Sequence, residues 1–324
     1  MGKINNTNLT ISHSFQEVSH NWLLTLRPRI KESSYVKYFN IVYIYLNPAF
    51  ENKMMEEISR ADVFQFCSYL SDSAGARSKS LAPKTINDIL SVLRSIFKYA
   101  AEEKGLSVSN ISGISVKIPY VPIQVLTLSE QKKLEDYLQQ NRTPCNIGIL
   151  LCLYTGLRIG EICALTWEDI STAAPIVYVH KTMQRIQQVD GEHPKTKVVV
   201  SSPKSNYSIR KIPLPPVIYQ LLQENRKDKD AYLLTGQKDR YMEPRSLENQ
   251  FHKALTSAGI ARMNYHVLRH TFATRCVELG FDIKSLSEIL GHSTINMTLN
   301  KYVHPSMELK QKNMNMLSEL FIDS

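Results

Sequence analysis

One interruption in an otherwise helical pattern constrains the fold of this 324-residue chain more than any other feature. Apolar residues recur at helical spacing along most of the sequence, but between residues 175 and 215 they alternate with polar ones, as they do in strands. This region predicts three strands, with Asp190-Gly191 as the hairpin turn between the first two: PIVYVHKTM (175–183), TKVVVSSPK (196–204) and SIRKIPLP (208–215). The chain is therefore expected to be mainly α-helical with a small antiparallel β-sheet.

A stretch without helical period divides the chain into two predicted domains. LSVSNISGISVKIPYVPIQV (106–125) contains glycine and two prolines, and domain boundaries fall in segments of this kind. We predict a helical domain over residues 1–112, a linker over 113–125 and a mixed α/β domain over 126–324. The length is enough for two domains with a substantial core.

Four helices are predicted before the linker. Two lie within residues 14–46, of which the second is broken by Asn47-Pro48, and a third begins after Ser59, which is a good N-cap. The fourth is the most clearly amphipathic helix of the chain, and Gly105 ends it. Its apolar stripe is formed by Ile86, Ile89, Leu90, Leu93, Phe97 and Ala100.

The charge of the chain favours a polyanionic partner. The net charge is +9 and the isoelectric point is about 9.2, values that suit nucleic acid or an anionic membrane. Residues 181–211, with seven Lys or Arg and two acidic residues, form the most basic stretch. No run of 18 apolar residues occurs, the N-terminus lacks a signal peptide, and the five cysteines are scattered without a C-x-x-C pair. We expect a cytoplasmic protein with buried free thiols.

Four residues with complementary chemistry fall in one stretch, YHVLRHTFATRCVELGFDIKSLSEILGHSTINMTLNKY (265–302): His266, Arg269, His292 and Tyr302. A guanidinium binds phosphate oxygens, an imidazole moves protons near neutral pH, and a Tyr hydroxyl can be a covalent nucleophile. His266 and Arg269 are three residues apart and share a helix face. Gly291 predicts a helix end that leaves His292 at a turn, from which a short helix would return Tyr302. The cluster suits chemistry on a phosphodiester.

Two further residues complete this candidate site. Arg158, in YTGLRIGE, follows a predicted buried helix that ends at Gly156, and Glu161 three residues later is expected to orient its guanidinium. A zinc site was also considered, because His266 and His270 are spaced i and i+4. The Glu of H-E-x-x-H and further ligands are missing, so we expect no metal.

Three segments together resemble the catalytic boxes of the tyrosine recombinases, also called phage integrases: TGLRIGEICALTW (155–167), HVLRHTFAT (266–274) and ILGHSTINMTLNKYVH (289–304). They occur in the order found in that family. The preceding hundred residues resemble its N-terminal, SAM-like core-binding domain more weakly. The resemblance implies a two-domain DNA clamp, with a four-helix N-terminal domain and a mixed α/β catalytic domain.

The resemblance also implies roles for the site residues. Tyr302 would attack the scissile phosphate to form a 3′-phosphotyrosyl bond, and Arg158 and Arg269 would bind the non-bridging oxygens. His292 would donate a further hydrogen bond, and His266 would accept the proton of the Tyr hydroxyl, whose ordinary pKa is about 10.

The acid that protonates the leaving 5′-oxygen is expected at the turn before the third strand. Lys204 lies there, with Lys195 and Lys197 as rivals. The resemblance further places the outer face of the fourth helix against DNA, although such a face is also an ordinary solvated one. The expected DNA-binding residues are Lys84, Asn87, Arg94, Lys98, Lys195, Lys197 and Arg210.

The function implied is that of a site-specific DNA recombinase or integrase, which rejoins strands through a Holliday junction without cofactors. Two rivals stay open: a type IB topoisomerase, which relaxes DNA as a monomer, and a DNA-binding regulator without catalysis. The expected partners are double-stranded DNA, further copies of the chain in a tetramer on paired sites, and accessory directionality factors. We expect the protein on the nucleoid of a bacterial cell. The terminal segment, with Met307, Met314, Leu317 and Leu320, is expected to dock on a neighbouring protomer.

Overall fold

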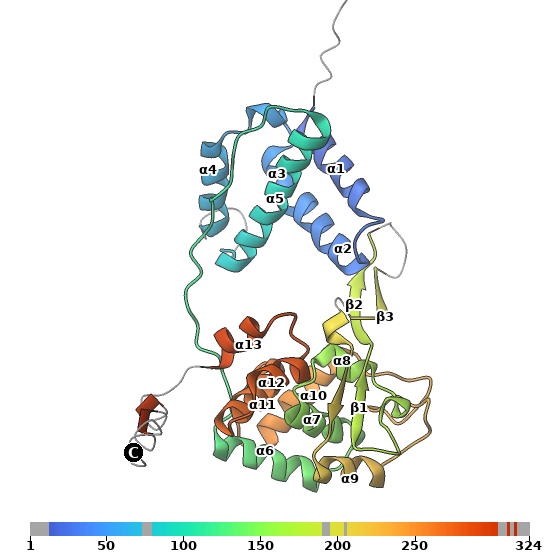
Figure 1. Cartoon of the computed structure of the whole chain (residues 1–324). Coiled ribbons are helices and arrows are strands. Elements are labelled where there is room, and N and C mark those ends of the chain that lie inside the picture. Colours follow the sequence, from blue (N-terminus) through green and yellow to red (C-terminus); the bar gives the residue numbers. More distant parts are fainter. Residues whose placement is uncertain are drawn as a thin grey trace, which may run out of the picture. The chain divides into compact units, whose positions relative to one another are not determined.

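A computed structural model describes residues 13–72, 80–189, 195–203, 206–303, 310–311 and 314–315 (Figure 1). The chain forms two compact units. The first comprises Met1–Val121 and Ile186–Thr196, and the second comprises Pro122–Arg185 and Lys197–Ser324. Among the described residues, no helix is long and apolar enough to cross a membrane.

The first unit is helical, as predicted. Its elements are α1 (Phe15–Leu26), α2 (Glu32–Ile41), α3 (Asn47–Phe50), α4 (Arg60–Ser71) and α5 (Pro83–Lys104). Ser59 is the N-cap of α4, since its hydroxyl accepts a hydrogen bond of 3.2 Å from the backbone N–H of Asp62. The predicted apolar stripe of α5 is buried in the core of the unit, and Gly105 ends the helix in the left-handed conformation.

The prediction that Asn47-Pro48 breaks the second helix was wrong. A π-helical turn, Val42–Leu46, follows α2 directly and continues into α3, so the helical run extends to Phe50. The backbone N–H of Asn47 bonds to the carbonyl of Val42, five residues earlier. Pro48, the second residue of α3, has no backbone N–H to donate to the preceding turn, and the wider π-helical turn lies directly before it.

The start of the predicted linker is fastened to α5. Asn87 binds the backbone of Val116 through both its amide nitrogen and its amide oxygen, at 2.7 and 2.9 Å. Arg94 donates to the carbonyl of Ile114 at 3.0 Å, and the Ile114 side chain is buried in the helical core. The outer face of α5 therefore holds the chain that leaves the unit.

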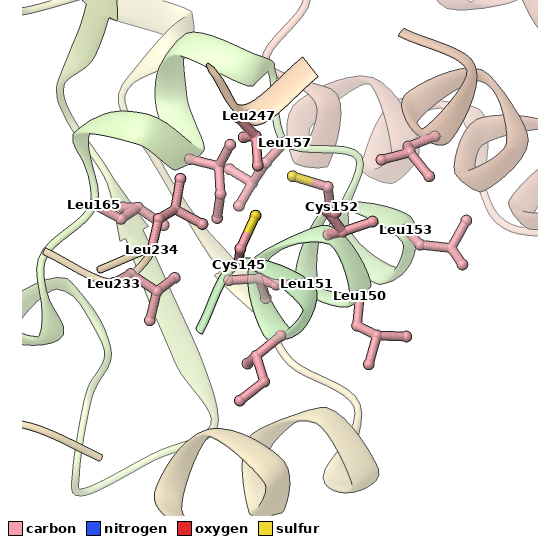
Figure 2. Close-up of a cluster of buried hydrophobic side chains, with 14 of the residues drawn as sticks. Cys145, Leu150, Leu151, Cys152, Leu153, Leu157, Leu165, Leu233, Leu234 and Leu247 are labelled. Carbon is pink, nitrogen blue, oxygen red and sulfur yellow. The ribbon is translucent and has the colours of Figure 1, made fainter. Parts of the chain in front are cut away.

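The second unit packs its helices around α7 (Pro144–Thr155), which is buried along nearly its whole length. The other helices are α6 (Leu128–Gln140), α8 (Ile159–Ala164), α9 (Pro216–Glu224), α10 (Pro244–Ser257), α11 (His266–Glu278), α12 (Ile283–Leu290) and α13 (Ile295–Tyr302). Figure 2 shows Cys145 and Cys152 among the leucines of this core. All five cysteines of the chain are buried free thiols, as predicted.

The strands differ from the prediction in number and pairing. The described residues contain four: β1 (Ile176–Val179), β2 (Thr182–Gln187), β3 (Thr196–Ser201) and β4 (Arg210–Pro213). β1 pairs with β4 in an antiparallel ladder, and β2 pairs with β3. The predicted first strand divides at His180 and Lys181, because both side chains bind the buried carboxylate of Asp169, at 2.8 and 2.9 Å.

Candidate active site

Arg158 is placed by the junction between α7 and α8. Gly156 ends α7 in the left-handed conformation, with φ of +64°, and Arg158 becomes the N-cap of α8. Its backbone N–H and its Nη1 donate to the two carboxylate oxygens of Glu161, at 2.9 and 2.7 Å. Its Nη2 donates to the carbonyl of Gly291 at 3.0 Å, while about a third of the side chain stays exposed. Glu161 thus orients a guanidinium that remains accessible.

Arg269, the second arginine of the site, lies on α11 and is only 4% exposed. Its Nη1 and Nη2 donate to the carbonyls of Gly156 and Leu290, both at 2.7 Å. Burial first, and then the charge of Arg158, lower the pKa of Arg269 to about 9. The guanidinium therefore keeps its charge at neutral pH.

His292 occupies the predicted turn after α12. Gly291 ends that helix with φ of +65°, a conformation that favours glycine. His292 Nδ1 lies 2.8 Å from the Thr298 hydroxyl, and its ring stacks parallel to that of Tyr302 with centroids 6.4 Å apart. Burial and the nearby charge of Arg269 lower the pKa of His292 to about 3, so the ring is neutral at physiological pH.

Tyr302, at the end of α13, is 6% exposed, and its hydroxyl lies 2.9 Å from Nδ1 of His270. Burial raises the pKa of the phenol, and Arg269 opposes that shift. His266, and not His270, is the proton acceptor that the sequence predicts for Tyr302. The i, i+4 spacing of His266 and His270 could have shown that His270 is a second candidate acceptor, because it places both histidines on one face of α11. The position of α13 relative to α11 determines which of the two histidines contacts the Tyr302 hydroxyl.

The two histidines of α11 differ in environment. Their rings lie 5.6 Å apart between centroids, but His266 is exposed and His270 is half-buried. Desolvation first, followed by the charge of Lys301, lowers the pKa of His270 to about 4. Desolvation and the charge of Arg269 also lower the pKa of His266. His270 is therefore neutral at pH 7, and a neutral imidazole can accept a proton.

Arg210 was expected to bind DNA, but its guanidinium is buried inside the second unit. Its side chain is 6% exposed and forms two hydrogen bonds with Glu161, of 3.0 and 2.9 Å. Nε donates to the carbonyl of Ile289 at 2.5 Å. The alternating pattern placed Arg210 on a strand but could not show that a buried carboxylate faces it.

The other expected DNA-binding residues are scattered over the described surface. Lys84 and Lys98 are exposed on α5, and Lys98 lies 3.8 Å from Glu102. Asn87 and Arg94 bind the backbone of residues 114–116, as described above. Lys195 is exposed and Lys197 is half-buried on β3. Lys204 lies outside the described residues.

The geometry thus gathers two arginines, three histidines and a tyrosine around the end of α12. The model of the Phage integrase family matches residues 124–308, and that of the phage integrase N-terminal SAM-like domain matches residues 14–71. The chain belongs to the phage integrase family.

Named relatives of this integrase chain agree with the assignment. It is 27% identical to the tyrosine recombinase XerC-like protein of Caldanaerobacter subterraneus subsp. tengcongensis, over 95% of this chain and 85% of the relative. It is 26% identical to the tyrosine recombinase XerC of Bacillus licheniformis, over 87% of this chain and 90% of the relative. The transposase of transposon Tn916 from Enterococcus faecalis is 28% identical over 61% of this chain and 52% of the transposase.

Solved structures share the fold. The Tn1549 transposon integrase in complex with a circular intermediate DNA superposes with a TM-score of 0.75 at 22% identity, over 94% of this chain and 100% of the integrase chain. A lambda integrase dimer bound to a COC′ core site gives a TM-score of 0.64 at 15% identity, over 90% of this chain and 78% of the lambda chain. The predicted fold class and the predicted enzyme class, a tyrosine-type site-specific recombinase, are confirmed by these matches.

Proposed function

We propose that this integrase cleaves and rejoins DNA through a covalent bond between Tyr302 and the 3′-phosphate of the cut strand. The observation that carries the proposal is the arrangement at the end of α12, where Arg158, Arg269 and His292 lie around the Tyr302 phenol. The Tyr302 oxygen attacks phosphorus, the bond from phosphorus to the 5′-oxygen breaks, and Arg158 and Arg269 offset the charge that develops on the non-bridging oxygens.

The proton of Tyr302 needs an acceptor, because the phenol is buried and its pKa is raised. We assign this role to His270 rather than to His266, since His270 Nδ1 lies 2.9 Å from the hydroxyl. His266, exposed and one turn before Arg269, would instead donate to a non-bridging oxygen. Lys204 would give its proton to the departing 5′-oxygen.

The phosphotyrosyl bond conserves the energy of the cleaved phosphodiester, so a 5′-hydroxyl of a partner strand can reverse the step. Repeated on paired sites, this exchange forms and resolves a Holliday junction. The relatives named as recombinases and transposases support this role, as does the solved lambda integrase tetramer bound to a Holliday junction. We further propose a DNA-contacting domain over residues 1–112, a linker over 113–125, a catalytic domain over 126–324, and assembly as a tetramer on bacterial nucleoid DNA.

A nicked suicide duplex tests the proposal, since loss of the short cut strand traps the covalent adduct. The wild-type chain should give a denaturant-resistant, protease-sensitive adduct with the site DNA. Tyr302→Phe should give none while it binds the same duplex with nearly unchanged affinity, because no charge that contacts phosphate is lost. An adduct formed by Tyr302→Phe would rule out Tyr302 as the nucleophile, and the absence of an adduct with the wild-type chain would contradict the proposed cleavage.

A further inference from the structure

The end of α12 is held by three guanidinium groups from three different elements. The carbonyls of Ile289, Leu290 and Gly291 accept hydrogen bonds from Arg210 Nε, Arg269 Nη2 and Arg158 Nη2, at 2.5, 2.7 and 3.0 Å. The last carbonyls of a helix have no intrahelical partner and carry partial negative charge. Three cations therefore satisfy three consecutive acceptors immediately before His292.

Arg210 differs from the other two in having little capacity left for a ligand. Nε donates to Ile289, Nη1 donates to Glu161 and to the carbonyl of Ser208, and Nη2 donates to Glu161. A guanidinium has five N–H groups in total. The Arg210 side chain is also 6% exposed, against 32% for Arg158. Arg210 is thus built into the protein, whereas Arg158 keeps an open side.

Glu161 joins these two arginines. Its carboxylate, 3% exposed, receives bonds from the Arg158 backbone and Nη1 on one side and from Arg210 Nη1 and Nη2 on the other. A buried carboxylate with one cationic partner removed is left with uncompensated charge, so loss of Arg210 must disturb how Glu161 holds Arg158.

Gly291 shows that the packing of Arg210 is close. A Cβ at this position would lie 3.0 Å from Arg210 Nη1, 3.1 Å from its Cδ and 3.2 Å from its Cζ. Glycine at position 291 therefore permits two things: the left-handed backbone that ends α12, and the close approach of the Arg210 side chain.

We infer that Arg210 is a positioning residue for strand cleavage, which acts through Glu161 on Arg158 and through the end of α12 on His292. The inference rests on the proposed function of this site. It replaces the expectation that Arg210 binds DNA, and it gives β4 a part in the reaction without contact to the substrate.

Arg210→Lys tests the inference, because lysine keeps the charge but cannot bind a carboxylate and a carbonyl together in a planar fork. Arg226→Lys is the matched control, since Arg226 is a half-buried arginine of the same unit that donates to the carbonyls of Trp167 and Ile170. Adduct formation is measured in single turnover, at a temperature at which circular dichroism shows every variant folded. DNA affinity is measured in parallel.

Each variant is assayed on normal suicide DNA and on DNA with a methylphosphonate at the scissile position. The neutral linkage needs less charge compensation in the transition state. The loss of rate in Arg158→Ala should therefore be smaller on the methylphosphonate than on the phosphodiester, and so should the loss of rate in any variant that acts through Arg158. We expect Arg210→Lys to slow adduct formation about 10²-fold on the phosphodiester, the scale of a small misplacement, and much less on the methylphosphonate. Its DNA affinity should be nearly unchanged. Arg226→Lys should lose little rate, and equally on both substrates.

A double-mutant cycle with Glu161→Gln completes the test. If Arg210 acts through Glu161, Arg210→Lys should slow the Glu161→Gln enzyme far less than it slows the wild type. Additive losses, an equal defect on both linkages, or weaker DNA binding without a rate defect would each overturn the inference. These outcomes require a wild-type adduct that Tyr302→Phe abolishes, so failure of the proposed function would be recognised separately.

Discussion

The hydroxyl of Tyr302 lies 2.9 Å from Nδ1 of His270, a residue that immediately follows the buried Arg269 on α11. The same helix turn therefore supplies a guanidinium for the phosphate and an imidazole for the phenol. The contact between Tyr302 and His270 predicts that substitution of His270 slows cleavage more than substitution of His266 does.

His270→Gln should slow single-turnover adduct formation by about 10²–10⁴-fold, the usual contribution of a positioned proton acceptor. His266→Gln is the matched control on the same helix face and should have the smaller effect. Rates are measured on the suicide duplex at several pH values. If His266→Gln is the slower variant, the proton goes to His266 and the contact with His270 is only structural.

The free protein should lose stability as the solution becomes mildly acidic. The pKa is lowered to about 4 in His270 and to about 3 in His292, below the value of about 6.5 expected in the unfolded chain. As pH falls below about 6.5 the unfolded chain takes up protons that the folded chain does not, so the free energy of unfolding decreases. Melting temperatures between pH 7.5 and 5 measure this.

A double variant separates the two histidines from other titrating groups in that experiment. The double variant His270→Gln, His292→Asn should show a flatter dependence of melting temperature on pH. Glu161 does not contribute in this window, because its pKa is lowered and its contribution is lost only at more acidic pH. An unchanged slope in the double variant would show that the two rings are not the groups that titrate.

Lys204→Ala should be slow on normal DNA and largely rescued on DNA with a 5′-bridging sulfur at the scissile phosphate. A thiolate departs without a proton, because the pKa of a thiol is near 8.5. Arg158→Ala and Arg269→Ala should stay slow on both substrates. Sulfur rescue of Lys195→Ala or Lys197→Ala, without rescue of Lys204→Ala, would move the acid to that lysine.

DNA affinity should fall steeply as salt increases. Each phosphate neutralised by Lys or Arg contributes about −0.9 to the slope of log affinity against log salt concentration. Substitution of the exposed Lys84 by Ala should make this slope shallower by about 0.9, the contribution of one phosphate contact. A slope near zero for the wild-type chain would contradict a multi-phosphate interface.

Deletion of residues 306–324 should leave binding to a single site intact and impair the pairing of two sites. Met314 is 60% exposed, as expected for a segment that docks elsewhere, while Met307, Leu317 and Leu320 lie outside the described residues. Native gels with one-site and two-site DNA separate the two steps. Unchanged recombination by the shortened chain would show that the segment has no role in assembly.

Local signals predicted several helix boundaries and one buried helix face. The left-handed glycines at 156 and 291, the Ser59 cap and the stripe of α5 are short-range features, and short-range features can be read from a sequence. The family boxes then brought together residues that lie more than a hundred positions apart, which no local pattern could do.

The errors arose where tertiary contacts decide. Pairing of Asp169 with His180 and Lys181 split a strand that alternation alone predicts as continuous. A π-helical turn carried the chain past Pro48. Arg210 looked like a surface cation because its partner, Glu161, is 49 residues earlier in the chain. For the strand and for Arg210, a partner outside the local pattern changed what local preference would give, whereas the π-helical turn rests on a bond between Asn47 and Val42, five residues apart.

The three-guanidinium end of α12 has a consequence for how such a site can be controlled. Because the carbonyls of Ile289, Leu290 and Gly291 are the shared anchor of Arg210, Arg269 and Arg158, a shift of that helix end displaces both phosphate-binding groups and His292 together. Strand cleavage then depends on the position of this one helix end. Any contact that moves this helix end would therefore change the charge compensation of the phosphate and the position of His292 in the same step.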